Sequence, residues 1–209
     1  GLLSPLFPEL EPLRLFAPGK YHVHDVLTHS IKTAGYMDNV LDELPTLSLD
    51  HGNTVRAHLE ERLEHLVPRK AALRFACLIH DNAKPETFSN VDGHVRFHGH
   101  DNLGAEKAVS ICRRFKLSKD TEKAVTRVIR QHMRLFNLSA PGGPSKNAMY
   151  RYCRDIGDAL PESLILAQAD ARAPREIMPS EQFTDTTESM AAMLEYYYPK
   201  FLQVEAKPL

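Results

Sequence analysis

Apolar residues recur at intervals of three and four positions along most of the chain, a spacing that places them on one face of an α-helix. Prolines and polar loops separate one such segment from the next. The pattern predicts helices over residues 26–44, 54–67, 69–82, 101–115, 118–135, 146–156, 161–174 and 185–203. Residues 69–82 (RKAALRFACLIHDN) are apolar around most of the helical circumference, so we expect this helix to be central.

Residues 86–98 show the alternation that is typical of strands, in two short runs that flank Asp92-Gly93. An Asp-Gly pair favours a tight hairpin turn. The proline-rich residues 1–20 predict an irregular N-terminal arm lying on the domain, and residues 185–209 predict a C-terminal helix and tail. The sequence therefore predicts an all-α fold: a compact bundle of about seven to eight helices with one small β-hairpin, in a single domain spanning residues 1–209.

The composition is that of an ordinary globular protein, with 43% hydrophobic and 25% charged residues among 209. The 26 Lys and Arg residues nearly balance the 27 Asp and Glu residues, which argues against a broad nucleic-acid-coating surface but leaves room for a local basic pocket. No apolar run reaches the roughly 18 residues of a membrane-spanning helix, and the start lacks a signal-peptide pattern. The three cysteines form no CxxC pair, which favours reduced thiols and a cytoplasmic location. The first residue, Gly1, suggests a cloning remnant or an excised piece of a longer protein.

His80 and Asp81 stand at the end of the most apolar predicted helix. A buried carboxylate costs several kcal/mol unless it is paired, so Asp81 requires either a cation that it shares with His80 or a basic side chain. For an isolated His-Asp pair, the basic side chain is the simpler solution.

The pair is not isolated, because other predicted helices carry further imidazole and carboxylate groups. These are His29 near the start of the first apolar helix, His100 just before residues 101–115, His132 near the end of residues 118–135, and Asp170 within the apolar run LILAQADARA. Helical bundles build metal sites from inward-facing groups of this kind. Imidazole and carboxylate ligands suit Fe, Mn, Zn, Ni or Co, and a set without cysteine is typical of a catalytic site with open positions.

The ordered residues His29, His80-Asp81 and Asp170 resemble the H…HD…D signature of the HD-domain metal-dependent phosphohydrolases. The segment LIHDNAKP resembles that family's HD-x-(G/A)-K segment, with Lys84 at the lysine position.

Two later segments extend the resemblance. FHGHDNLGAEKA is similar to the family's GHE-x-x-GA segment, with His100 at the histidine and Asp101 in place of the commoner Glu. IRQHMRL is similar to the later histidine segment and places His132 there. The similarity spans roughly residues 20–175 and is greatest to the HD domains of bacterial tRNA nucleotidyltransferases and poly(A)-polymerase-like proteins.

The resemblance implies that His29, His80, Asp81 and Asp170 bind a first divalent metal, and that Asp81 bridges to a second metal held by His100 and His132. The ions would be Fe, Mn, Ni, Co, Zn or Mg. We favour two metals; the alternative is one metal, with His100 and His132 contacting the substrate phosphate. Lys84 and Arg172 are expected to bind that phosphate, with Asp81 and Lys84 as the catalytic residues.

The implied activity is hydrolysis of a phosphomonoester or phosphodiester, with a nucleotide as the expected substrate, by a metal-bound hydroxide. The alternative is a non-catalytic HD module that binds metal or nucleotide and acts with an RNA-processing partner. The chain shows no glycine-rich motif followed by the D-x-D pair of a nucleotidyltransferase, so we do not expect it to add nucleotides to tRNA by itself. The net charge of −1 gives no support to an RNA partner, no membrane partner is expected, and the sequence leaves the oligomeric state open.

Other polar residues are interpreted as solvent-facing. His98 is the alternative to His100, which the motif context favours. His58 and His65 lie on one polar helical face, and Arg127 and Arg130 are interpreted as surface charges.

Overall fold

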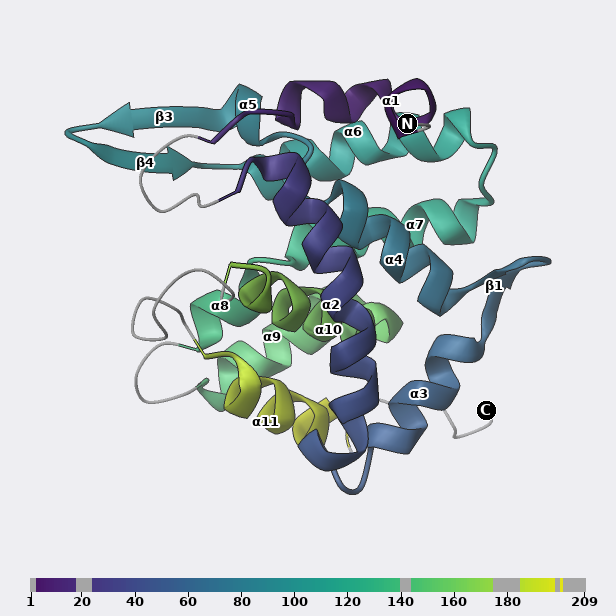
Figure 1. Cartoon of the computed structure of the whole chain (residues 1–209). Coiled ribbons are helices and arrows are strands. Elements are labelled where there is room, and N and C mark those ends of the chain that lie inside the picture. The colour runs from purple at the N-terminus through teal and green to yellow at the C-terminus, as the bar shows by residue number, and fades with distance from the viewer. Residues whose placement is uncertain (1–2, 18–23, 140–143, 175–184, 198–199, 201–209) are drawn as a thin grey trace.

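The regular structure is almost entirely helical in the computed structural model, which describes residues 3–17, 24–139, 144–174, 185–197 and 200 (Figure 1). The longer helices are α2 (Val26–Leu47), α4 (Arg69–Ile79), α6 (His100–Arg114), α7 (Lys119–Gln131), α9 (Lys146–Ile156), α10 (Leu160–Arg172) and α11 (Thr187–Tyr197). The shorter helical segments are α1 (Leu3–Leu6), η1 (Pro8–Leu13), α3 (Gly52–Glu60), α5 (Lys84–Thr87), α8 (Arg134–Leu138) and η2 (Gly157–Ala159). Two small antiparallel strand pairs complete the described residues: β1 (Arg62–Glu64) with β2 (Val67–Pro68), and β3 (Phe88–Val91) with β4 (His94–Phe97). The predicted all-α class is confirmed.

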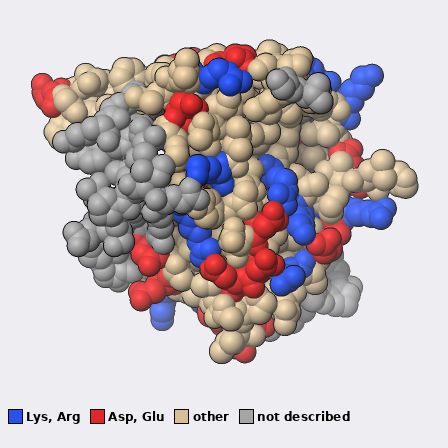
Figure 2. Space-filling model, in the orientation of Figure 1, with Lys and Arg blue, Asp and Glu red and all other residues tan. Residues whose placement is uncertain are grey.

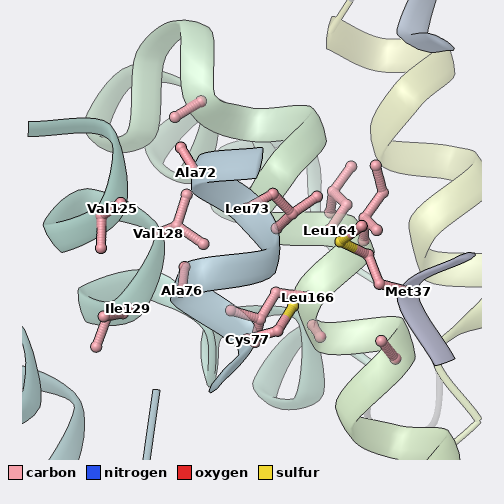
Figure 3. Packing of buried hydrophobic residues seen from close by; sticks show 14 of the residues in the cluster. Met37, Ala72, Leu73, Ala76, Cys77, Val125, Val128, Ile129, Leu164 and Leu166 are labelled. Carbon is pink, nitrogen blue, oxygen red and sulfur yellow. The ribbon is translucent and has the colours of Figure 1, made fainter. Parts of the chain in front are cut away.

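Helix α4 lies at the centre of the core, as its apolar circumference predicts. Figure 3 shows Ala76 of α4 facing Ile129 of α7, while Leu73 and Cys77 turn toward α10 and α2. Five residues of α4 enter the core, and each is at most 4% exposed: Ala72, Leu73, Ala76, Cys77 and Ile79. Because α4 is enclosed by α2, α7 and α10, the turn that follows Ile79 begins inside the protein.

Local signals in the sequence set several helix and turn boundaries correctly. The Asp25 side chain accepts a hydrogen bond from the Thr28 amide at 2.8 Å and caps α2, and Ser118 caps α7 through the Thr121 amide at 3.1 Å. Asp92 and Gly93 both have positive φ, 52° and 78°, as a two-residue hairpin turn between β3 and β4 requires. The turn confirms the predicted hairpin, and the two caps account for helix starts that the apolar pattern places near residues 26 and 118.

The predicted helix over residues 54–67 is wrong in its second half. Helix α3 ends at Glu60, and the chain then forms the β1–β2 pair. Pro68 disfavours a helical conformation at the preceding residue, Val67. The Glu64 carboxylate also accepts hydrogen bonds from the Ser118 amide at 3.1 Å and the Thr121 hydroxyl at 2.9 Å. These tertiary contacts stabilise the extended conformation of β1.

Other boundaries differ by a turn or less. Helix α2 continues past Pro45 to Leu47, because a proline in the last turn removes only one helical hydrogen bond. Helix α4 is shorter than residues 69–82, since residues from His80 onward form a turn. The described part of the predicted irregular arm, residues 1–20, contains α1 and η1, and η1 buries Leu10 and Leu13. The predicted tail beyond residue 197 lies, apart from residue 200, outside the described residues, and the single-domain assignment stays a prediction.

The face seen in Figure 2 shows Lys and Arg side chains interspersed with Asp and Glu. No helix within the described ranges combines the length and the apolar character needed to cross a bilayer.

Candidate metal centre

Six side chains that are far apart in the sequence meet where five elements converge. They are His29 in the first turn of α2, His80 and Asp81 in the turn after α4, His100 at the start of α6, His132 directly after α7, and Asp170 in the last turn of α10. These are the six metal ligands that the resemblance implies. The structure brings all of them together, with 141 positions separating His29 from Asp170.

The first half of the cluster surrounds one oxygen of each carboxylate. His29 Nε2 lies 2.7 Å from Asp170 Oδ1 and 3.7 Å from Asp81 Oδ2. His80 Nε2 lies 3.3 Å from Asp81 Oδ2 and 3.6 Å from Asp170 Oδ1. Two imidazoles and two carboxylates therefore face one small volume, and their donor atoms are of the kind that holds a divalent cation.

The second half of the cluster adjoins the other oxygen of Asp81. His100 Nε2 lies 3.7 Å from Asp81 Oδ1 and 3.1 Å from His132 Nε2. Asp81, His100 and His132 thus form a second group that could hold a cation. Asp81 is common to both halves and turns a different oxygen toward each.

Three of the histidines are oriented by the carbonyl at the position three residues earlier. His80 Nδ1 donates to Cys77 O at 2.8 Å, His100 Nδ1 to Phe97 O at 2.8 Å, and His132 Nδ1 to Ile129 O at 2.6 Å. A carbonyl can only accept, so each Nδ1 carries a hydrogen and each neutral ring presents the Nε2 lone pair to the cluster. Such hydrogen bonds are the usual supports of metal-binding histidines.

The polar atoms at the centre are not satisfied by the described part of the protein. His80 Nε2 and both oxygens of Asp81 are buried and accept or donate no hydrogen bond of suitable geometry. The two Nε2 lone pairs of His100 and His132 face one another and would repel without a cation or proton between them. Lys84 Nζ, 2.7 Å from Asp81 Oδ2, supplies one positive charge against the buried carboxylate of Asp81 and the partly buried carboxylate of Asp170. The donor set therefore fits a divalent cation, with Lys84 as a partial counter-charge.

The electrostatics of the cluster are strongly coupled. Burial opposes the charged form of His80, but the carboxylates of Asp81 and Asp170 outweigh it and raise the pKa of His80 to about 10. Burial likewise opposes ionisation of Asp81 and Asp170, yet the facing histidines hold the pKa of each well below its usual value. Burial together with the positive charge of neighbouring imidazoles lowers the pKa of His132 to about 4.

The sequence predicts that Lys84 and Arg172 bind phosphate, but in the structure the two side chains have different surroundings. Lys84 enters the cluster, where its Nζ also lies 5.4 Å from the centre of the Phe97 ring. Arg172 forms a two-point ion pair with Glu43, at 2.9 and 2.6 Å, at the rim of α2 and α10. This pairing engages the guanidinium and gives no support to a phosphate-binding role.

The structure also shows the positions of two other histidines, His98 and His58. His98 is exposed, whereas His100 is buried in the cluster. His58, expected to be solvated, is half-buried, and its Nε2 lies 3.2 Å from Glu162 Oε2. The buried Glu162 explains this difference, because its carboxylate pairs with both His58 of α3 and Arg69 at the start of α4.

The residues that hold the Asp81 turn against α6 escaped the sequence analysis. Lys107 Nζ donates to Asn82 O at 2.6 Å and to Glu86 Oε1 at 2.5 Å, and Asn82 Nδ2 donates to Gly104 O at 3.3 Å. A Cβ on Gly104 would lie 3.2 Å from His80 O, so glycine allows the helix to approach the turn. Because α6 also begins with His100, this contact fixes the two halves of the cluster relative to each other.

Fold and cluster together define an all-α protein whose core carries a His/Asp group suited to divalent metals. Residues 26–175 match the HD domain family, and the chain belongs to that family. It is also 30% identical over 183 residues to the A-adding tRNA nucleotidyltransferase of Deinococcus radiodurans, an alignment that covers 87% of this chain and 35% of the relative. The chain thus spans about a third of the length of this relative. The resemblance to HD domains related to tRNA nucleotidyltransferases is confirmed; the family is a superfamily of metal-dependent hydrolases whose domains bind divalent metals.

Proposed function

We propose that the chain is a metal-dependent phosphohydrolase that cleaves a phosphomonoester or phosphodiester of a nucleotide. The observation that carries the proposal is the position of Asp81, which is buried between two sets of imidazoles and turns one oxygen toward each. A carboxylate in this position is suited to bridge two metal ions.

In this proposal His29, His80, Asp81 and Asp170 hold one ion, and Asp81, His100 and His132 hold the other. Divalent ions held there would lower the pKa of a coordinated water toward about 7 and draw charge from the phosphate oxygens. The Nδ1 hydrogen bonds of His80, His100 and His132 keep these rings aimed at the centre, so that no reorientation is needed when the ligands are used. Metal analysis of the loaded protein distinguishes two ions from the alternative of one.

Lys84 is proposed to neutralise substrate phosphate. Its ammonium group is tethered beside Asp81 and its pKa is raised, since the carboxylates of Asp81 and Asp170 outweigh the opposing effect of burial. A permanent positive charge in a largely buried position favours an anionic substrate. Arg172 has no part in the proposal because Glu43 engages it.

The proposed substrate class and the proposed cellular location rest on different observations. The relative from Deinococcus radiodurans is named for tRNA, which supports a nucleotide or RNA substrate for this chain. The alternative, a non-catalytic HD module that acts with an RNA-processing partner, would use the same ligands to hold an ion without turnover. Cys77, Cys112 and Cys153 are all free and buried, which supports a cytoplasmic protein.

The experiment uses metal-stripped protein reloaded separately with Mn, Ni, Co, Mg or Fe(II). We expect metal-dependent hydrolysis of p-nitrophenyl phosphate or its bis ester, and of a nucleoside monophosphate or dinucleotide. Binding of these ions without hydrolysis of any of these esters would contradict the enzyme and favour the module. Fe(II) is loaded without oxygen, so that any activity of the iron form is hydrolysis rather than oxidation of the substrate.

Metal binding at pH 7 is expected to release a proton from His80. The pKa of about 10 lies above the ordinary 6.5, so between these two values the folded protein keeps a proton that the metal must displace. Apparent metal affinity should therefore rise about tenfold per pH unit across this window. Isothermal titration in buffers that differ in ionisation enthalpy measures the release.

The matched variants for this measurement are His80→Asn and His132→Asn. Because the pKa of His132 is about 4, this residue is already neutral at pH 7, and its replacement should leave the buffer-dependent heat in place. Replacement of His80 should reduce that heat. Equal heats in all buffers for the unmodified protein would contradict the prediction.

A further inference from the structure

Three phenylalanine rings, Phe16, Phe88 and Phe97, cluster where the β3–β4 hairpin joins the elements of the metal centre. The hairpin lies between α5, which begins with Lys84, and α6, which begins with His100 (Figure 1). The ring centres lie 5.8 Å (Phe16 to Phe88), 6.1 Å (Phe88 to Phe97) and 6.5 Å (Phe16 to Phe97) apart. Phe88 and Phe97 are also direct cross-strand partners, so their side chains share one face of the hairpin. Phe16 and Phe88 thus fix the position of the Phe97 ring.

The Phe97 ring in turn adjoins two groups of the metal centre. Lys84 Nζ lies 5.4 Å from the ring centre, within the roughly 6 Å over which an aromatic face attracts a cation. The centre of the His100 ring lies 6.4 Å away, and its plane is inclined by 76° to that of Phe97. Phe97 therefore contacts both the ammonium group of Lys84 and a candidate metal ligand.

Among the described residues, the Lys84 ammonium group contacts two neighbours of different kinds. The first is Asp81 Oδ2, at 2.7 Å. This oxygen also faces His29 and His80, so a divalent cation in the first half of the cluster would compete with the ammonium group for it. The second neighbour, the Phe97 ring, is neutral and is no ligand for such a cation. The ring is therefore the neighbour that can hold the ammonium group beside the centre when the oxygen is engaged by metal.

We propose that Phe97 is a positioning residue whose ring keeps the Lys84 ammonium group beside the metal centre, where that group meets the substrate phosphate. The inference rests on the proposed function, because it concerns how Lys84 reaches the phosphate. Without the ring, the flexible four-carbon side chain of Lys84 would be free to turn toward solvent once a divalent ion repels its charge. A cation–π contact of this partly buried kind changes an equilibrium constant by about tenfold.

The test measures two affinities of the full chain by isothermal titration: that of metal-stripped protein for Mn²⁺, and that of Mn²⁺-loaded protein for inorganic phosphate. Phe97→Leu keeps an apolar side chain but removes the aromatic face, and Phe97→Tyr restores that face. The control is Phe115→Leu, because the Phe115 ring also carries a cation, with Arg114 Cζ 4.6 Å from its centre. Phe115 likewise belongs to a cluster of three phenylalanines, with Phe7 and Phe75. Thermal unfolding verifies that each variant folds.

We expect Phe97→Leu to bind phosphate about tenfold more weakly than Phe115→Leu, and Phe97→Tyr to recover most of that loss. The affinity for Mn²⁺ should be retained in all three variants. Loss of an outer support of a metal ligand lowers metal affinity by roughly 10- to 100-fold, so a fall of that size in Phe97→Leu would show that the ring supports His100 instead. That result, or equal phosphate affinity in Phe97→Leu and Phe115→Leu, would overturn the inference.

A double variant, Lys84→Met with Phe97→Leu, separates positioning from a general structural role. A residue that acts through Lys84 has no further effect once Lys84 is replaced, so the double variant should bind phosphate as Lys84→Met alone does. Equal weakening by Phe97→Leu in the presence and absence of Lys84 would contradict the proposal. If Phe97→Leu does not fold, replacement of Phe97 with pentafluorophenylalanine keeps the ring but reverses the charge distribution of its face, and the same loss of phosphate affinity is expected.

Phosphate binding requires no turnover, so this inference and the proposed hydrolase can fail separately. Phosphate affinity that depends on Phe97 through Lys84, in a protein that hydrolyses no ester, supports the positioning role and contradicts only the hydrolase. Hydrolysis of small esters by a protein whose phosphate affinity is insensitive to Phe97→Leu contradicts only the positioning role.

Discussion

Replacement of Asp81 with alanine is expected to abolish both divalent-metal binding and phosphoester hydrolysis. The two oxygens of Asp81 face different sets of imidazoles, with His80 3.3 Å from one and His100 3.7 Å from the other. Loss of a shared ligand should cost more than the roughly 10- to 100-fold that removal of an outer partner of a metal ligand costs. Metal content and hydrolysis of the bis ester, measured on the same sample, test this expectation.

Two companion variants make the result specific. Asp170→Ala removes a carboxylate that lies closest to His29 and His80 and is also within reach of a cation shared with His132. It does not belong to the group formed by Asp81, His100 and His132, so the variant should weaken metal binding in the first half of the cluster more than in the second. Asp38→Ala breaks an exposed ion pair with Arg74 and should change neither readout. Full activity of the Asp81 variant, with folding verified by thermal unfolding, would refute the proposed role.

The helical architecture could be predicted because most of it is encoded locally. Apolar periodicity identified the central helix α4 and the segments that form α2 and α7, whose first turns Asp25 and Ser118 cap. The β1–β2 pair could not be predicted in this way, because its stability depends on Glu64 bonding to the start of α7, more than 50 positions later. Periodicity reports which face of a segment is buried, but it carries no information about such distant partners.

The candidate site likewise combines residues that the sequence identifies with contacts that the sequence does not reveal. Asp81 and Asp170 could be singled out because each places a carboxylate in an apolar segment, where a charge is costly without a partner. The resemblance to the HD-domain phosphohydrolases then grouped them with His29, His80, His100 and His132 as candidate ligands. The backbone carbonyls that orient the imidazoles have no sequence signature, and the contact of Lys107 with Asn82 depends on how α6 lies against the turn. Arg172 illustrates the opposite error: its proximity in sequence to Asp170 suggested a role, whereas the side chain pairs with Glu43.

Replacement of Lys84 with methionine is expected to raise metal affinity while lowering hydrolysis, which separates binding from catalysis. The Lys84 ammonium group lies 2.7 Å from Asp81 Oδ2 and remains charged, because the buried carboxylates raise its pKa above the usual value. Removing this charge leaves the carboxylates less neutralised, so a divalent cation meets less repulsion. The substrate phosphate loses its positive partner, and loss of one such electrostatic contact typically costs 10²- to 10³-fold in rate.

The control is Lys70→Met, since Lys70 is partly exposed and its Nζ lies 3.8 Å from the exposed Glu60. This variant should leave metal affinity and hydrolysis unchanged, because an exposed pair in water contributes little. A Lys84 variant that loses metal and activity together would show that Lys84 supports the fold of the turn rather than the substrate. Opposite movements of the two readouts would instead place the ammonium group against the phosphate, because only a contact with the substrate lowers the rate while the ions are held more tightly.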